Sequence, residues 1–307
     1  KQYGGLEPRL SMRYTLDKNN SVKASFNRNL QYVHLASFSS IGLPTDTWIP
    51  SGKNVKPQEA VQYSVGWFRD LMQRTYEGSI ELYYKNMANQ IEYAEGASPD
   101  QGGNANYDAL LVFGKGWSYG AEFFLKRRTG RLTGWVGYTW SKTMRQFPEV
   151  DNNEPFPSRW DRRHDLSVVA GYELTERWTL VATFVYSTGQ ATTLPVQRYF
   201  IENRLVSEYT QRNGFRRAPY NRLDIAATIK NRPTKQVTDK VTGEVSTVPR
   251  KYRSSWTFSI YNVYNRANPY FYYFDASSDS GAAGLTVQAK QVSLFPILPS
   301  ITWNFEF

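Results

Sequence analysis

Hydrophobic and polar residues alternate along most of this sequence with a period of two, which is the pattern of half-buried β-strands. The clearest case lies between residues 165 and 187, where two alternating segments flank the short turn Thr175-Glu176. One face of these segments carries Leu166, Val168, Ala170, Tyr172, Trp178, Leu180, Ala182, Phe184 and Tyr186. The same rule predicts strands around residues 10–16, 22–27, 61–67, 76–85, 118–126, 132–141, 223–230 and 255–260.

Two features of these strands favour a transmembrane β-barrel over a soluble β-sandwich. The polar face is rich in Gly, Ser, Thr, Asn and single charges, which suits a water-filled lumen. Aromatic residues also lie near the strand ends, as an interfacial girdle requires; they are Trp67, Tyr76, Trp140, Trp178, Tyr186 and Trp256. We therefore expect an all-β, antiparallel transmembrane barrel whose apolar face contacts lipid.

Arg28 departs from this pattern because it falls on the apolar phase of its strand. An Arg at the bilayer midplane costs roughly 2–4 kcal/mol. We therefore expect Arg28 either to lie near a membrane interface or to follow a bulge that shifts the phase of the strand.

The connections between predicted strands alternate between short and long. Short turns fall around residues 17–20, 70–75, 127–131 and 175–177, and long loops around 35–57, 90–109, 146–160, 190–217 and 266–286. Outer-membrane barrels have short periplasmic turns and long extracellular loops. One inner connection, 231–250, is longer than this rule, and its segment 239–244 reads as the tip of a small hairpin.

The strand count depends on how the C-terminal segment is read. Pro296 and Pro299 could form a turn, but apolar residues keep one phase back from Phe307 to Phe295. A single descending strand over 287–307 also ends the chain on the periplasmic side. This gives about eleven strands, an odd number that cannot close a single-chain bacterial barrel. We expect residues 1–307 to be the C-terminal part of one barrel of about 22 strands, without its plug and N-terminal strands.

Composition and charge fit this picture better than they fit a soluble protein. Aromatic residues make up 16% of the chain although the mean hydropathy is -0.57. The net charge of +10 would suggest nucleic acid, but it is not gathered in one run. The predicted inner turns hold 13 Lys and Arg against 5 Asp and Glu, whereas the long loops are net acidic. We therefore expect a basic inner rim and no nucleic-acid partner.

The sequence offers little for catalysis or metal binding. It has no cysteine and two histidines, so thiolate chemistry and a His-rich metal site are excluded. Gly116-Trp-Ser118-Tyr-Gly120 matches the G-x-S-x-G pattern, but no helical segment follows it, as a nucleophile elbow needs. The sequence contains no run of 18 apolar residues, so it predicts no transmembrane helix. We therefore expect that the chain is not an enzyme and binds no cofactor. Because residue 1 is Lys, we also expect the chain to be a processed or partial product.

The last residues alternate once more. Ile301, Trp303, Phe305 and Phe307 share one face and Thr302, Asn304 and Glu306 the other. An alternating aromatic terminus that ends in Phe resembles the signal recognised by the outer-membrane barrel-assembly machinery.

Two features of the predicted outer loops suggest contacts with substrate or partner. The segment Arg159-Trp-Asp-Arg-Arg-His-Asp165 is a dense charge cluster, which either attracts anions such as lipopolysaccharide phosphates or orders the rim through Arg–Asp pairs; we favour ordering of the rim. Aromatic platforms suit sugars, peptides and protein interfaces. The candidate contacts are Trp48, Tyr93, Trp160, Arg162, Arg163, Tyr199 and Phe200.

Four segments in order carry a family resemblance: Gly4-Gly-Leu-Glu-Pro-Arg-Leu-Ser-Met-Arg-Tyr14, Ile49-Pro-Ser-Gly-Lys-Asn-Val-Lys-Pro57, Trp160-Asp-Arg-Arg-His-Asp-Leu-Ser167 and Tyr261-Asn-Val-Tyr-Asn-Arg266. They resemble the barrel of TonB-dependent receptors, most of all the Bacteroidota type that begins with a carboxypeptidase-regulatory-like domain.

The resemblance implies a bacterial outer-membrane importer whose plug is displaced by the TonB complex with energy from the inner membrane. It implies as partners the N-terminal strands and plug, the TonB complex, a surface lipoprotein, and outer-membrane lipid with lipopolysaccharide. The alternative is a non-transporting barrel subunit of an outer-membrane assembly.

Overall fold

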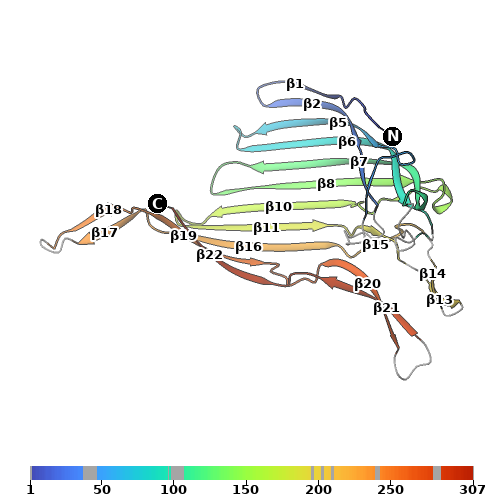
Figure 1. Cartoon of the computed structure of the whole chain (residues 1–307). Coiled ribbons are helices and arrows are strands. Elements are labelled where there is room, and N and C mark those ends of the chain that lie inside the picture. Colours follow the sequence, from blue (N-terminus) through green and yellow to red (C-terminus); the bar gives the residue numbers. More distant parts are fainter. Residues whose placement is uncertain are drawn as a thin grey trace.

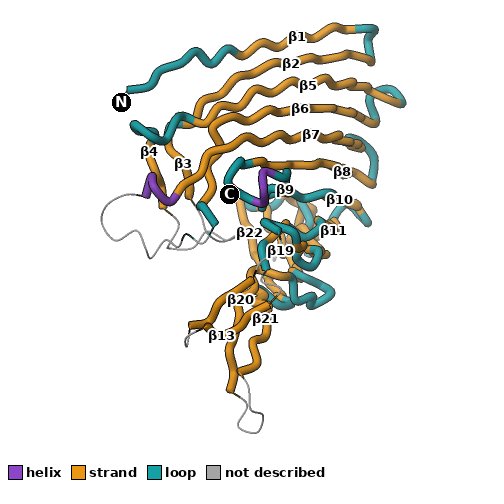
Figure 2. The backbone as a smooth tube through the Cα atoms, turned by 90° about the vertical axis from the view of Figure 1, so that its right-hand side faces the viewer, coloured by secondary structure: helices purple, strands orange, loops and turns teal. Residues whose placement is uncertain are grey.

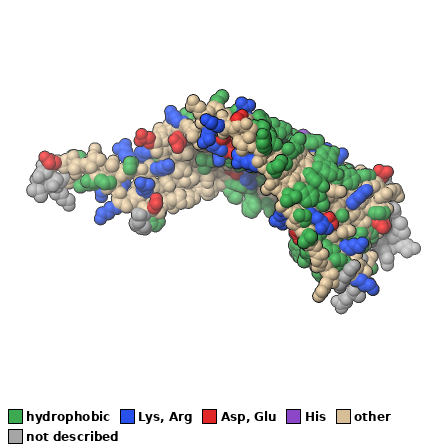
Figure 3. All heavy atoms as spheres, turned by 90° about the horizontal axis from the view of Figure 1, so that it is seen from above, with side chains coloured by type: hydrophobic (Ala, Val, Ile, Leu, Met, Phe, Trp, Pro, Cys, Tyr) green, Lys and Arg blue, Asp and Glu red, His purple; other side chains and the backbone are tan. Residues whose placement is uncertain are grey.

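The fold is an open, curved antiparallel β-wall with loops and hairpins at both rims (Figure 1). The computed structural model describes residues 2–36, 47–95, 97, 107–194, 197–201, 204–208, 211–238, 243–278 and 285–306. Seen from above, the molecule has an arched outline (Figure 3). No helix in these ranges is long and apolar enough to cross a membrane.

Eleven strands pair in sequence order to form the wall, which confirms the predicted count. The main sheet has twelve strands, of which β9 (Phe156–Pro157) lies off the path and pairs only with β8. The wall strands are β1 (Arg9–Thr15), β2 (Asn20–Gln31), β5 (Gln58–Leu71), β6 (Tyr76–Tyr93), β7 (Leu111–Arg127), β8 (Leu132–Gln146), β10 (His164–Glu173), β11 (Trp178–Ser187), β16 (Tyr220–Lys230), β19 (Arg253–Tyr261) and β22 (Leu298–Glu306).

The two faces of the wall differ as the alternation predicts. Facing polar side chains are hydrogen-bonded across neighbouring strands, as in Ser25 Oγ with Ser64 Oγ at 2.6 Å and Thr228 Oγ1 with Thr257 Oγ1 at 2.9 Å. The opposite face exposes large apolar side chains, including Leu82, Phe123, Val136, Leu180 and Phe258. Figure 3 shows hydrophobic side chains gathered along the arch. This arrangement suits a polar lumen and a lipid-facing exterior.

The connections also divide as predicted, with tight turns at one end of the strands and long loops at the other (Figure 1). The inner connection between β16 and β19 forms the expected hairpin, β17 (Thr234–Thr238) with β18 (Val245–Pro249), which projects from the rim of short turns. At the other rim lie the small pairs β3 (Val33–Ala36) with β4 (Thr47–Pro50), β12 (Ala191–Thr192) with β15 (Phe215–Arg216), and β13 (Gln197–Ile201) with β14 (Arg204–Glu208). Short 3-10 turns, η2 (Tyr107–Leu110) and η3 (Asp151–Asn153), lie in two of these loops.

The C-terminal passage is not the single continuous strand expected over 287–307. Residues 285–293 form β21 (Leu285–Ser293), which pairs with β20 (Pro269–Ser278) in a hairpin outside the wall (Figure 2). Residues 294–297 then interrupt the passage, and Phe295 has a positive φ of 54°. Pro296 has no N–H to donate to a ladder, and pairing resumes at β22, which accommodates Pro299 opposite Ile260. The strand count survives because β21 and β22 together make one descent.

Arg28 lies near the loop end of β2, as the interface explanation requires. Its pairing with Val61 belongs to an unshifted register between β2 and β5, so no bulge moves it to the other face. The Arg28 guanidinium instead donates two hydrogen bonds to the Glu59 carboxylate, at 2.7 and 3.1 Å. This cross-strand pair offsets the charge on the outward face.

Candidate functional site at the outer mouth

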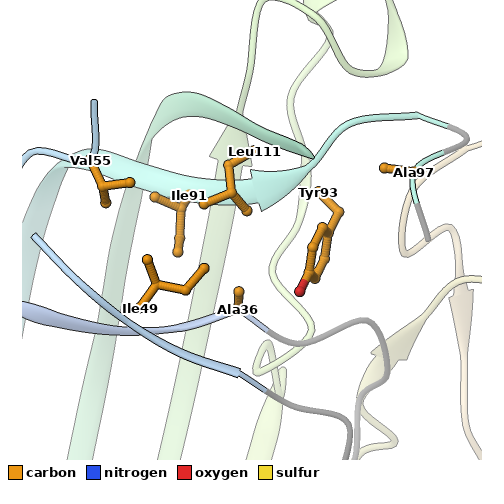
Figure 4. Close-up of a cluster of buried hydrophobic side chains, with 7 residues drawn as sticks. All are labelled: Ala36, Ile49, Val55, Ile91, Tyr93, Ala97 and Leu111. Carbon is orange, nitrogen blue, oxygen red and sulfur yellow. The ribbon is translucent and has the colours of Figure 1, made fainter. Parts of the chain in front are cut away.

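The first part of the outer mouth is a buried apolar cluster that fastens the β3–β4 pair onto the wall. Ile49 and Ala36 come from this pair, and Ile91, Tyr93 and Leu111 from the ends of β6 and β7 (Figure 4). The register between β6 and β7 shifts between Met87 and Gln90. This bulge brings Ile91 and Tyr93 opposite Phe113 and Leu111, where the hairpin covers them.

The predicted exposure of Tyr93 is therefore wrong, since only 1% of the residue is exposed. The sequence placed Tyr93 in a loop, but β6 continues to this residue. Because the bulge and the covering hairpin are both tertiary features, alternation alone could not reveal them.

A buried carboxylate holds the second part of the mouth together. Asp161 is fully buried, and its Oδ1 accepts a hydrogen bond from the backbone N–H of Thr143 at 2.6 Å. Its Oδ2 binds Arg216 in a short ion pair and lies 3.6 Å from Arg163 Nη2. Arg216 also donates to the backbone oxygens of Asp161 and Gly189, at 3.1 and 3.2 Å. Asp161 thus ties the β8–β10 connection to the β11–β16 loop.

The turn at Arg212 and Asn213 links three further segments. The Arg212 backbone N–H donates to Asp151 Oδ2 at 2.8 Å, and its Nη2 donates to the Tyr93 carbonyl oxygen at 2.9 Å. Asn213 Nδ2 donates to the Pro157 carbonyl oxygen at 2.9 Å. One turn of the β11–β16 loop therefore contacts the ends of β6, η3 and β9 at once.

Burial shapes the electrostatics of this network. Desolvation raises the pKa of Asp151 above its usual value, and the hydrogen bond from the Arg212 backbone opposes that shift. Desolvation likewise lowers the pKa of the Arg217 guanidinium. Arg217 Nη1 donates to the Tyr270 carbonyl oxygen at 3.1 Å, which connects the loop to the β20–β21 hairpin. Side chains of Arg212, Arg216 and Arg217 therefore connect the described parts of the β11–β16 loop to neighbouring outer segments.

The other residues predicted to contact a substrate or partner lie on separate elements of the outer mouth. Trp48 on β4 and Trp160 in the β8–β10 connection are 62% and 54% exposed. Arg162 Nη1 lies 3.7 Å from Asp165 Oδ2, so the charge cluster contains this Arg–Asp pair in addition to the pair between Arg163 and Asp161. The backbone of Tyr199 and Phe200 lies in β13, opposite Val206 and Leu205, and their side chains fall outside the described part of the structure.

Sequence reasoning missed Arg212 and Arg216, which connect distant segments of the mouth. Both lie in the predicted loop 190–217, but nothing local marks them as bridging residues. Their partners Tyr93 and Asp161 are 119 and 55 positions away. The visible signal was Asp161 itself, a carboxylate surrounded by Arg in the charge cluster.

The terminal aromatic residues lie together as the alternation predicts. Ile301, Trp303 and Phe305 share the exposed apolar face of β22. The Trp303 ring stacks on Phe305 with centroids 4.8 Å apart and on Trp256 with centroids 5.9 Å apart. Phe307 is outside the described residues. The role of this set as an assembly signal stays a prediction.

The G-x-S-x-G segment lies inside a wall strand. Ser118 on β7 shares a hydrogen bond of 2.8 Å with Thr143 Oγ1, and no strand-to-helix turn surrounds it. Among the described residues there is no group of three or more His, Cys, Asp or Glu side chains placed to hold a metal ion.

These features define part of an outer-membrane β-barrel: an antiparallel wall, apolar outside and polar inside, with tight turns at one rim and joined loops at the other. The profile of the family described as "TonB dependent receptor-like, beta-barrel" matches residues 1–265. The chain therefore belongs to this family of outer-membrane proteins, whose members are transporters and not enzymes.

Solved structures agree on the fold. The siderophore receptor PiuA from Acinetobacter baumannii aligns with a TM-score of 0.56 at 12% identity, over 97% of this chain and 35% of that one. The ferripyoverdine receptor of the outer membrane of Pseudomonas aeruginosa aligns at 0.55 and 15% identity, over 99% and 33%. The ferric citrate transporter FecA aligns at 0.52 and 12% identity, over 97% and 37%.

This chain thus spans about a third of the length of these structures. A sequence search of curated proteins finds no match.

Proposed function

We propose that residues 1–307 are the C-terminal part of a single outer-membrane barrel domain and form the wall and extracellular mouth of a TonB-dependent importer. The carrying observation is an eleven-stranded wall whose outer loops are hydrogen-bonded to one another. Loops that are already ordered lose less entropy when a ligand binds, so they suit a receptor mouth. Energy for import comes from the inner membrane through the TonB complex and a plug.

The directions of the two edge strands of the wall indicate how many further strands are needed to close the barrel. Every neighbouring pair along the wall is antiparallel, so the first and eleventh strands, β1 and β22, run in the same direction. A second copy related by a two-fold axis along the barrel would meet both edges in parallel. A segment with an odd number of strands meets both edges antiparallel. We infer that N-terminal strands of the receptor, odd in number, close the barrel around the plug.

The proposed outer contacts are the members of the predicted set other than the buried Tyr93. Trp48, Trp160, Arg162, Arg163, Tyr199 and Phe200 remain our proposed contacts for a substrate or for a surface lipoprotein. The exposed rings of Trp48 and Trp160 suit this role because each offers an apolar face and a polar edge. Tyr93 is withdrawn because it is buried.

We further propose that the receptor is of the Bacteroidota type with a carboxypeptidase-regulatory-like domain, on the strength of the four resembling segments. The sequence that precedes Lys1 in the gene tests this directly. A regulatory-like domain, a TonB box and a plug upstream support it, and a plug without the regulatory-like domain contradicts this finer assignment.

Import is tested by uptake in cells that carry the complete receptor. Ferric citrate and ferripyoverdine, labelled with radioactive iron, are the first probes because the similar structures bind ferric chelates; an oligosaccharide, a peptide and a cobalamin complete the panel. We expect uptake of one probe to fall to background when the TonB box is deleted, and also when loop 190–217 is deleted, with the barrel still assembled. If the assembled receptor takes up none of these probes in a TonB-dependent way, the non-transporting subunit is favoured.

A further inference from the structure

The lipid-facing side of the wall contains an open hollow close to the rim of short turns. It has a volume of about 420 Å³ and crosses β5 to β8. Its lining includes Trp67, Arg69, Gly78, Phe123, Leu125 and Val136. The volume lies within the range of roughly 300–1,000 Å³ found for small-molecule sites.

The hollow exists because a glycine stands in an outward row of large side chains. Gly78 pairs with Arg69 on one side and with Leu125 on the other, and all three share the apolar phase. The glycine does not serve the backbone: a Cβ added there would meet its nearest atoms at 3.7 and 3.8 Å, an ordinary contact distance. The absent side chain therefore leaves room on the membrane face without any need from the fold.

Two cations flank the hollow on the same face. The Arg69 guanidinium lies 5.9 Å from the Trp67 ring centroid, and the Arg127 guanidinium lies 5.6 Å from that of Tyr76. Gly78 is three residues from the turn at Thr75, or roughly 10 Å along the strand. The hollow therefore lies close to the ends of the strands, where a barrel wall meets the membrane–water interface.

These two arginines differ from their neighbour Arg128, which faces the other way. Arg128 pairs with Asp70 at 3.2 Å and with Glu77 at 2.8 Å. Neither Arg69 nor Arg127 lies within ion-pair distance of a carboxylate in the described part of the chain. Asp17, in the adjacent turn, accepts hydrogen bonds from Asn19 and Asn20 and interacts with Arg69 electrostatically, beyond ion-pair distance. Arg127 Nε donates to the Thr129 carbonyl oxygen at 3.2 Å. In the described part of the chain, neither outward guanidinium therefore binds a carboxylate directly.

We propose that the hollow holds one anionic phospholipid of the periplasmic leaflet. Its acyl chain lies over Gly78 toward Trp67 and Phe123, and its phosphate lies at Arg69 with Arg127 beside it. Guanidinium groups recognise phosphate through charge-assisted hydrogen bonds. A bound lipid would place an anion in direct contact with these guanidinium groups and fill the space that the glycine leaves.

The test is native mass spectrometry of the complete receptor, delipidated in detergent and titrated with palmitoyl-oleoyl phosphatidylglycerol or phosphatidylcholine. We expect the wild type to bind phosphatidylglycerol in preference. Arg69→Gln and Arg127→Gln should each weaken that binding roughly fivefold, as expected for one basic residue near an anionic headgroup. Gly78→Leu should remove binding of both lipids by filling the hollow.

Two matched control variants distinguish lipid binding in the hollow from non-specific effects of charge and apolar area. Lys126→Gln removes the same charge one residue from Arg127 but on the lumen-facing side, and Ala182→Leu adds the same apolar side chain elsewhere on the outer face. Both should bind lipid as the wild type does. Equal binding of the two lipids, or unchanged phosphatidylglycerol binding in either Arg69→Gln or Gly78→Leu, overturns the proposal. Heat-modifiable migration in gels verifies that each variant barrel is folded.

Discussion

Asp161→Asn is the sharpest test of how the outer mouth is held together. The substitution keeps the size of the side chain, and its amide oxygen can still accept the hydrogen bond that the Thr143 N–H donates at 2.6 Å. It removes the negative charge that faces Arg216 and Arg163. The expected result is that the turn at 211–217 detaches more often while the wall stays folded.

The free-energy cost of Asp161→Asn depends on how deeply Asp161 and its two Arg partners are buried. The Asp161 side chain is 0% exposed, whereas those of Arg216 and Arg163 are 35% and 31% exposed. Breaking a buried ion pair costs about 3–5 kcal/mol, and water can solvate the two partly exposed guanidinium groups. We therefore expect a local cost of about 2 kcal/mol. That corresponds to a roughly 30-fold increase in the open population of the loop.

Hydrogen–deuterium exchange of the purified receptor measures that population. The reporting amide is Arg217 N–H, which donates to the Gln190 carbonyl oxygen at 3.0 Å. Asp165→Asn is the matched control, because Asp165 and Arg162 are 42% and 45% exposed and such pairs contribute about 0–1 kcal/mol. Unchanged exchange at 211–217 in Asp161→Asn, or an equal change in the control, would refute the role assigned to Asp161.

Three further predictions follow from other parts of the molecule. Burial lowers the pKa of His34 below its usual 6.5, so the folded state resists protonation, and stability is present above that pH and lost as pH falls toward the lowered pKa; the protection of β3 and β4 amides, corrected for the intrinsic pH dependence of exchange, should fall between pH 7.5 and 5.5, and His34→Gln should abolish that fall. Gly134 has a φ of 150°, and a Cβ there would overlap β10, so Gly134→Ala should reduce the yield of folded barrel, whereas Gly171→Ala, with its nearest contact at 3.6 Å, should not. Trp303→Ala loses two ring contacts worth about 0.5–1.5 kcal/mol each; pulse-chase labelling should show slower assembly into the outer membrane than for Thr302→Ala, and equal rates would contradict the assembly signal.

The wall was predictable because the alternation of residues within each strand identifies the two faces of that strand. Alternation between Trp178 and Tyr186, and between Leu166 and Tyr172, specifies which face meets lipid without reference to any other strand. Short turns such as Thr175-Glu176 then force neighbouring strands to pair antiparallel. Local periodicity and turn length therefore sufficed for the fold and for the strand count.

The outer mouth was predictable only in part. The charge cluster at Arg159–Asp165 predicted Arg–Asp pairs, and the structure contains two of them. The partner Arg216 could not be foreseen, since loop residues carry no periodic signal that reports what they contact. Tyr93 was misplaced for a related reason, because a bulge between Met87 and Gln90 resets the phase of β6.

The sequence by itself determined the number of wall strands, the two faces of the wall and the charge difference between its rims, because these depend on period and on position along the chain. Only the tertiary structure decided the rest: the burial of Tyr93 under β3–β4, the bridge from Asp161 to Arg216, and the hollow over Gly78 beside Arg69 and Arg127. Each of these depends on residues that are distant in sequence or lie on neighbouring strands, and their contact is set by register and loop packing rather than by the order of residues within one segment.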